Sequence, residues 1–138
     1  MSALIKKFCD AVKNGENEVE VWGDGSQTRE LIYVEDQIIG LLALIEYMDS
    51  VEWKGPELVN IGTGVETSIR DLAETIQKLS GFNGKINYNT DKFVGVRRKV
   101  LDISLADYLF GWTYDYGIHS LEEGIQKSID WYVREVQK

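Results

Sequence analysis

The chain has 138 residues, of which 43% are hydrophobic and 28% charged, proportions typical of a single globular domain with a buried core. The net charge of −8 argues against general binding to nucleic acids or anionic membranes, and there is no apolar run long enough to span a membrane. A single cysteine excludes an internal disulfide framework and favours a reducing, cytoplasmic setting. We therefore expect one domain over residues 1–138.

The predicted elements alternate between helices and strands, a pattern typical of the α/β class. From the N-terminus, the patterns predict a helix over 2–14, strands over 18–22 and 30–34, a helix over 35–50 and a strand over 57–61. There follow a helix from Ser68 to Gly81, strands over 85–89 and 96–103, a short helix from Ser104 to Gly111, and a last helix that begins after Ser120.

Cap residues mark the ends of two of these helices. Ser68-x-x-Asp71 and Ser120-x-x-Glu123 each have the spacing of a capping box, and Gly81 is a typical helix stop. The helix over 35–50 has apolar residues around a wide arc, so we expect it to be buried on more than one side.

The strongest candidate for a ligand site is the segment from Trp22 to Asp36. Trp22 and Arg29 flank a Gly-x-Gly turn, so a flat ring and a planar cation can converge on one small volume. Arginine offers forked donors to phosphate and tryptophan offers a stacking face, which together suit a ligand with an aromatic ring and a phosphate. The alternative is a hairpin in which Trp22 belongs to the core and Arg29 is solvated. Likewise, the cationic run 97–99 fits either a buried anion or a solvated strand edge.

Several apparent catalytic signals are better explained as structure. Tyr88-x-x-x-Lys92 has the spacing of a catalytic tyrosine–lysine pair, but it falls in a strand-to-loop context instead of on a helix. Gly62-x-Gly64 lacks a third glycine and fits a short strand-to-helix turn. We expect His119 to have a surface role and Cys9 to be a small core residue. One histidine and one cysteine also argue against a zinc site.

A set of motifs in register resembles the extended short-chain dehydrogenase/reductases that act on nucleotide-sugars, and within them the GDP-L-fucose synthases. The motifs are Trp-Gly-x-Gly-x-x-x-Arg-Glu at 22–30, Val-Asn-Ile-Gly-Thr-Gly at 59–64, Ser-Ile-Arg-Asp-Leu-Ala at 68–73, Gly-x-x-Arg-Lys-x-Leu-Asp at 95–102, Phe-Gly-Trp at 110–112 and Leu-Glu-Glu-Gly at 121–124. The resemblance covers nearly the whole chain, but only the second, C-terminal half of such enzymes.

The resemblance implies a substrate-binding domain of a few short strands and four to five helices, without the Rossmann half that holds NADP. The catalytic serine, the catalytic Tyr-x-x-x-Lys, and the epimerising cysteine and histidine would all lie upstream of Met1, so we expect this chain alone to bind no cofactor and to be inactive. The implied partner is a GDP-sugar or another nucleotide-diphosphate sugar. Its contacts would come from Lys7, Trp22, Arg29, Lys99 and, as an assistant to Lys99, Arg98. Lys7 falls where the family carries an arginine, so it keeps the charge but loses the fork.

Two other interpretations remain open. In the first, the wide apolar faces of helices 2–14 and 35–50 lack the sheet that covers them in the full enzymes and are buried by self-association or by a partner, which makes the chain an oligomeric interaction module without a small ligand. Alternatively, a separate polypeptide supplies the Rossmann half, and the two chains together form the enzyme.

Overall fold

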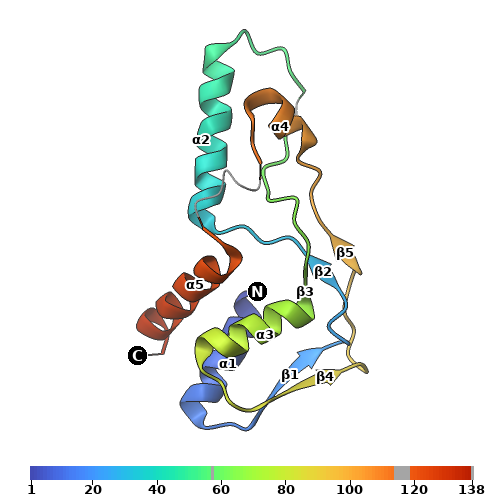
Figure 1. Ribbon diagram of the computed structural model, residues 1–138, viewed down its shortest axis with the longest axis vertical. Helices are drawn as coiled ribbons and strands as arrows, with labels where there is room; N and C mark the ends of the chain where they lie inside the picture. Colours follow the sequence, from blue (N-terminus) through green and yellow to red (C-terminus); the bar gives the residue numbers. More distant parts are fainter. Residues whose placement is uncertain (57, 114–118, 138) are drawn as a thin grey trace.

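The computed structural model describes residues 1–56, 58–113 and 119–137, and it has the expected α/β composition (Figure 1). A first group of elements packs around the larger core: α1 (Ser2–Asn14), β1 (Glu18–Trp22), α3 (Ile69–Ser80), β4 (Lys85–Asn89) and α5 (Leu121–Glu135). Helices α1, α3 and α5 contact one another, and Phe8, Leu72, Ile76 and Ile125 are fully buried between them. Within the part of the chain that is described, no helix is long and apolar enough to span a membrane.

Strands β1 and β4 form a parallel pair in which Trp22 lies opposite Asn89. Successive side chains of a strand point to opposite faces. Val19 and Val21 are therefore buried against the core, whereas Trp22 projects on the other face and is 52% exposed. The predicted strands over 18–22 and 85–89 are thus confirmed, and Trp22 is not part of the core.

A second group of elements surrounds Trp112. It consists of α2 (Val34–Ser50), α4 (Ser104–Phe110) and the extended segment that contains Ile61, which lie together in the upper part of Figure 1. The Trp112 indole donates a hydrogen bond of 2.7 Å to the carbonyl of Gly62. A Cβ atom on Gly40 would lie 2.8 Å from the Trp112 ring, so only glycine lets α2 approach this closely.

A small three-stranded sheet lies between the two groups, in the order β3 (Thr67–Ser68), β2 (Thr28–Arg29) and β5 (Arg98–Lys99). The Glu30 carboxylate follows β2 and accepts hydrogen bonds from the backbone N–H groups of Thr63, Gly64 and Leu101 at 2.5, 3.2 and 2.6 Å. The Gly62-x-Gly64 turn is thereby fixed to β2, but it is not the expected strand-to-helix turn, because no strand directly precedes it among the described residues and α3 begins only at Ile69.

The predicted helix ends agree with the structure. Ser68 accepts a hydrogen bond of 3.0 Å from the Asp71 N–H, and Gly81 ends α3 with a positive φ of 74°. The Ser120–Glu123 capping box is complete, because each residue's side chain accepts from the other's backbone N–H. These caps are local in sequence, which makes them easy to predict.

Three predicted strands differ from the structure. The strand expected over 30–34 is absent, because β2 ends at Arg29 and Val34 already belongs to α2. The strand expected over 96–103 is only β5. Residue 57 lies outside the described residues, and 58–61 are extended but form no strand. A strand needs a hydrogen-bonded neighbour, and nothing in the described chain pairs with 58–61.

Helix α2 also departs from expectation, because it is buried on one side only. Ile39 and Leu44 pack on the Trp112 core, but a stripe of large apolar side chains faces outward. The stripe consists of Ile38, Leu41, Leu42, Ile45 and Met48, which are 36–53% exposed.

Candidate functional site

Two of the predicted ligand residues, Arg29 and Lys99, lie side by side across the β2–β5 pair. The strands are parallel, with Arg29 opposite Lys99 and Thr28 opposite Arg98. Because side chains alternate along a strand, Arg29 and Lys99 share one face. Both line an open hollow of about 500 Å³, which we call the β2/β5 hollow. Its volume is within the range of about 300–1,000 Å³ typical of small-molecule sites.

Arg29 is half-buried at the edge of this hollow, and its Nη1 donates a hydrogen bond of 2.7 Å to the carbonyl of Thr28. That bond fixes one arm of the guanidinium group and leaves further N–H donors of its fork for a ligand. Lys99 is exposed beside it. The two cations therefore offer a local positive site in a chain whose net charge is −8.

Arg98 lies on the opposite face and has a structural partner. Its guanidinium group forms an ion pair of 2.6 Å with Glu66. The Glu66 carboxylate also accepts a hydrogen bond of 2.8 Å from the Thr28 hydroxyl. The hydrogen bond from Arg98 lowers the pKa of Glu66 below its usual value. The structure thus separates Arg98 from the face that Arg29 and Lys99 share.

Trp22 and Lys7 lie together at the end of β1, apart from the residues that line the β2/β5 hollow. The Lys7 ammonium is 5.7 Å from the centroid of the Trp22 ring and donates a hydrogen bond of 2.8 Å to the carbonyl of Glu20. The Trp22 indole N–H donates to the Glu20 carboxylate at 2.9 Å. Hydrogen bonds from Asn89 and then Trp22 lower the pKa of Glu20.

The sequence interpretation missed Lys92 as a member of this group. The Lys92 ammonium lies 5.8 Å from the Trp22 ring centroid. We call Trp22, Lys7 and Lys92 the Trp22 platform. In the sequence, Lys92 is notable only for its spacing from Tyr88, and that spacing does not show which residues lie next to Lys92 in the fold.

Tyr88 has a packing role of its own. It belongs to strand β4, and the Arg70 guanidinium carbon lies 4.1 Å from its ring centroid. Burial raises the pKa of Tyr88, and its hydroxyl has no hydrogen-bond partner within the described part of the chain. The strand context expected for the Tyr88-x-x-x-Lys92 spacing is therefore confirmed.

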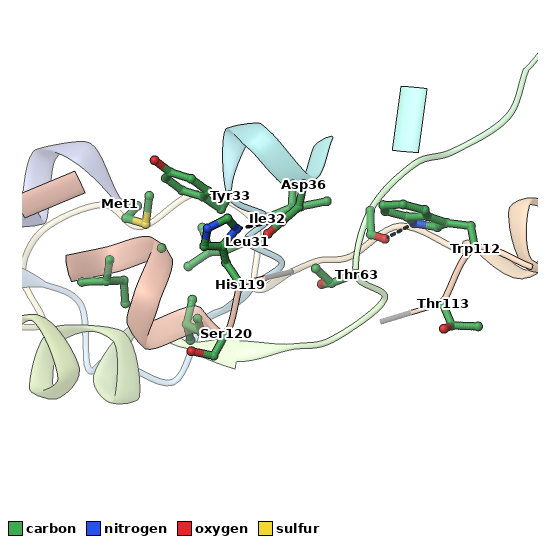
Figure 2. A pocket seen from close by; sticks show the side chains of 14 residues that line it. Met1, Leu31, Ile32, Tyr33, Asp36, Thr63, Trp112, Thr113, His119 and Ser120 are labelled. Carbon is green, nitrogen blue, oxygen red and sulfur yellow. Dashed lines mark hydrogen bonds and ion pairs between the residues drawn. The ribbon is translucent and has the colours of Figure 1, made fainter. Parts of the chain in front are cut away.

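His119 is not the surface residue that we expected. Its side chain is only 13% exposed, and its Nδ1 lies 2.9 Å from the Asp36 carboxylate while its ring packs 4.9 Å from that of Tyr33 (Figure 2). Glu35 lies 3.6 Å from the other ring nitrogen. The sequence could not show this pairing, because His119 and Asp36 come from the starts of two helices distant along the chain.

The cavity beside His119 has a volume of only about 40 Å³. A water molecule needs about 10–15 Å³ on this measure, so the cavity has room for a few waters and not for a nucleotide. The His119 cluster therefore serves to join α2 to α5. Cys9 is buried in the core as expected, and burial raises the pKa of its thiol. Among the described residues, no group of three histidine, cysteine or carboxylate side chains could hold a metal ion.

Comparisons with known proteins agree with this architecture. Residues 1–62 match the NAD dependent epimerase/dehydratase family. The chain is 38% identical to GDP-L-fucose synthase 1 of Arabidopsis thaliana over 136 residues, which are 99% of this chain and 39% of that protein. It is 37% identical to GDP-L-colitose synthase of Yersinia pseudotuberculosis, over 96% of this chain and 41% of that protein.

Solved structures show the same relationship. A UDP-glucose 4-epimerase of Thermotoga maritima, solved with UDP-glucose, superposes with a TM-score of 0.73 at 29% identity over 98% of this chain and 40% of its own. A GDP-L-fucose synthetase of Naegleria fowleri shares the fold, with a TM-score of 0.80 at 22% identity over 99% of this chain and 39% of its own. A UDP-glucuronic acid 4-epimerase of Bacillus cereus, also similar, was solved with NAD. The chain spans about two fifths of the length of the curated relatives it matches.

Proposed function

We propose, from the premise that this chain belongs to the NAD dependent epimerase/dehydratase family, that it is the nucleotide-diphosphate-sugar-binding part of an epimerase or reductase. The observation that carries the proposal is the placement of Arg29 and Lys99 on one face of β2 and β5, beside a hollow of about 500 Å³. Two adjacent cations suit a diphosphate, and the arginine fork adds geometric selectivity for its oxygens.

The Trp22 platform, at the other end of the segment from Trp22 to Arg29, supports the same proposal. An exposed indole ring with cations beside it can stack a nucleobase and attract the phosphate next to it. A GDP-sugar is the preferred ligand, because the relatives named above are a GDP-L-fucose synthase and a GDP-L-colitose synthase. A UDP-sugar is the runner-up, since the Thermotoga maritima neighbour was solved with UDP-glucose.

In this proposal, NAD(P) binding and hydride transfer belong to the part of the family fold that this chain does not span. A second candidate function has one specific observation in its favour, the exposed apolar stripe of α2 beside the unpaired segment 58–61. Such a surface is expected to be covered, either by a second copy or by a Rossmann half on a separate chain. In this second candidate function the chain is an assembly module, whether or not it also binds a nucleotide.

The experiment that tests the proposal is calorimetric titration of the chain with GDP, GDP-mannose, UDP-glucose and NADPH. We expect saturable binding of GDP or GDP-mannose and none of NADPH. In the Arg29→Ala variant the GDP affinity should fall by about 1.5–3 kcal/mol, the usual contribution of a hydrogen bond to a charged group.

Arg134→Ala is the matched control, because Arg134 lies on α5 and, among the described residues, forms an ion pair only with its neighbour Glu135. It removes the same charge from the chain and should leave the affinity unchanged. Equal losses in the two variants would mean that net charge alone attracts the nucleotide. Absence of binding by the unsubstituted chain would leave the assembly module as the better description.

A further inference from the structure

The binding residues of the proposed site lie on two chain segments whose ends are paired with each other. The first segment leads from β1 to β2, with Trp22 at its start and Arg29 at its end, seven residues later. The second leads from β4 to β5, with Lys92 three residues after Asn89, the partner of Trp22, and Lys99 at its end. Parallel pairing fixes both ends, because β1 pairs with β4 and β2 pairs with β5.

Local contacts hold the Lys92 end of the second segment against the first. The Gly23 N–H donates a hydrogen bond of 2.8 Å to the carbonyl of Asn89, and the Lys92 N–H donates 3.4 Å to the same oxygen. Val94 lies where a side chain on Gly23 would be, and Gly23 has a positive φ of 84° that also favours glycine. The position of Lys92 beside Trp22 therefore follows from the backbone of both turns.

No described residue forms a hydrogen bond or ion pair with the Lys92 ammonium, although its charge acts on the nearby Glu20 carboxylate. Its ammonium is 5.8 Å from the Trp22 ring centroid, and its side chain is exposed. A cation–π contact at an exposed site is weak, so a phosphate oxygen is a stronger partner for this ammonium than the ring. Lys7 is held differently, by its 2.8 Å hydrogen bond to the Glu20 carbonyl.

We infer that Lys92 is a further ligand-binding residue, which completes a four-point site for a nucleoside diphosphate. The base stacks on Trp22, Lys92 meets the phosphate nearer the ribose, and Arg29 with Lys99 holds the rest of the diphosphate. The inference rests on the proposed function, since it extends the site built on Arg29. Lys92 thus has a binding role that does not involve Tyr88, and the Tyr88-x-x-x-Lys92 spacing is not that of a catalytic pair here.

The test is titration of GDP into the full chain and its Lys92→Ala, Lys92→Arg and Lys78→Ala variants. Lys92→Ala should weaken GDP binding about tenfold, as expected from loss of a charged hydrogen bond. Lys92→Arg keeps the charge and should stay within about threefold of the unsubstituted chain. Lys78→Ala removes an exposed cation from the far end of α3 and should have no effect.

Equal affinities for Lys92→Ala and Lys78→Ala would overturn the inference. If Arg29→Ala still weakened binding in the same series, the proposed function would stand without Lys92. If the unsubstituted chain bound no GDP, the proposed function and the role of Lys92 would both be contradicted. Circular dichroism of each variant shows whether the fold is retained, and loss of binding in a folded Lys92→Ala protein with recovery in Lys92→Arg supports the inference.

Discussion

At the scale of single residues, Asp10 joins the first helix to the end of the last. It accepts hydrogen bonds from Lys6 at 2.5 Å, from Tyr132 at 3.0 Å and from Gln137 at 2.9 Å. The bonds from Lys6 and then Gln137 lower the pKa of Asp10 from 3.8 to about 2. Because the folded-state pKa is depressed, this carboxylate stabilises the fold above its unfolded-state pKa, and the contribution is lost as the pH falls.

We therefore expect acid to weaken the link between α1 and α5 between pH 3.8 and about 2. In the Asp10→Asn variant, the free energy of unfolding should be lower at pH 7 and should vary less with pH in this window. Urea denaturation at a series of pH values measures both. Asp107→Asn is a suitable control, because Asp107 lies on α4 away from this cluster. Parallel pH profiles for the unsubstituted protein and Asp10→Asn would show that Asp10 has no such role.

At the scale of elements, α2 presents an apolar stripe that no described residue covers. Exposed apolar surface of this kind tends to be buried by association. The chain should therefore self-associate at micromolar concentration in sedimentation velocity. Replacing both Leu42 and Ile45 by lysine should restore the monomer. Val133→Lys is the control, since Val133 is 48% exposed on α5, outside the stripe. A monomeric unsubstituted chain would contradict this prediction.

Helices were easier to predict from the sequence than strands, and the reason is physical. The helix from Ser68 to Gly81 is specified by its own cap residues and periodicity, which act within a few positions. The strand expected over 57–61 depends on a neighbour that the described chain does not supply, so its apolar residues alone could not decide the outcome. The same dependence explains why the wide apolar arc of α2 does not lead to burial on two sides.

At the scale of the whole molecule, two sheets and two linking segments place the binding residues. Sequence motifs singled out Trp22, Arg29 and Lys99, but spacing could not show that Arg29 and Lys99 share a face while Arg98 lies on the other. That division follows from the register of β2 and β5. Lys92 was not predicted as a site residue, because its proximity to Trp22 depends on the pairing of β1 with β4.

The most direct test of the central claim is a two-dimensional NMR titration of the labelled chain with GDP, read at its four indole N–H resonances. We predict a saturable shift of the Trp22 signal, because the base stacks on that ring. The Trp131 signal is the internal control, since its side chain is 54% exposed, close to the 52% of Trp22, but lies on α5. A shift confined to Trp22 that disappears in Arg29→Ala would support the nucleotide site. Unchanged Trp22, or equal shifts of Trp22 and Trp131, would contradict it.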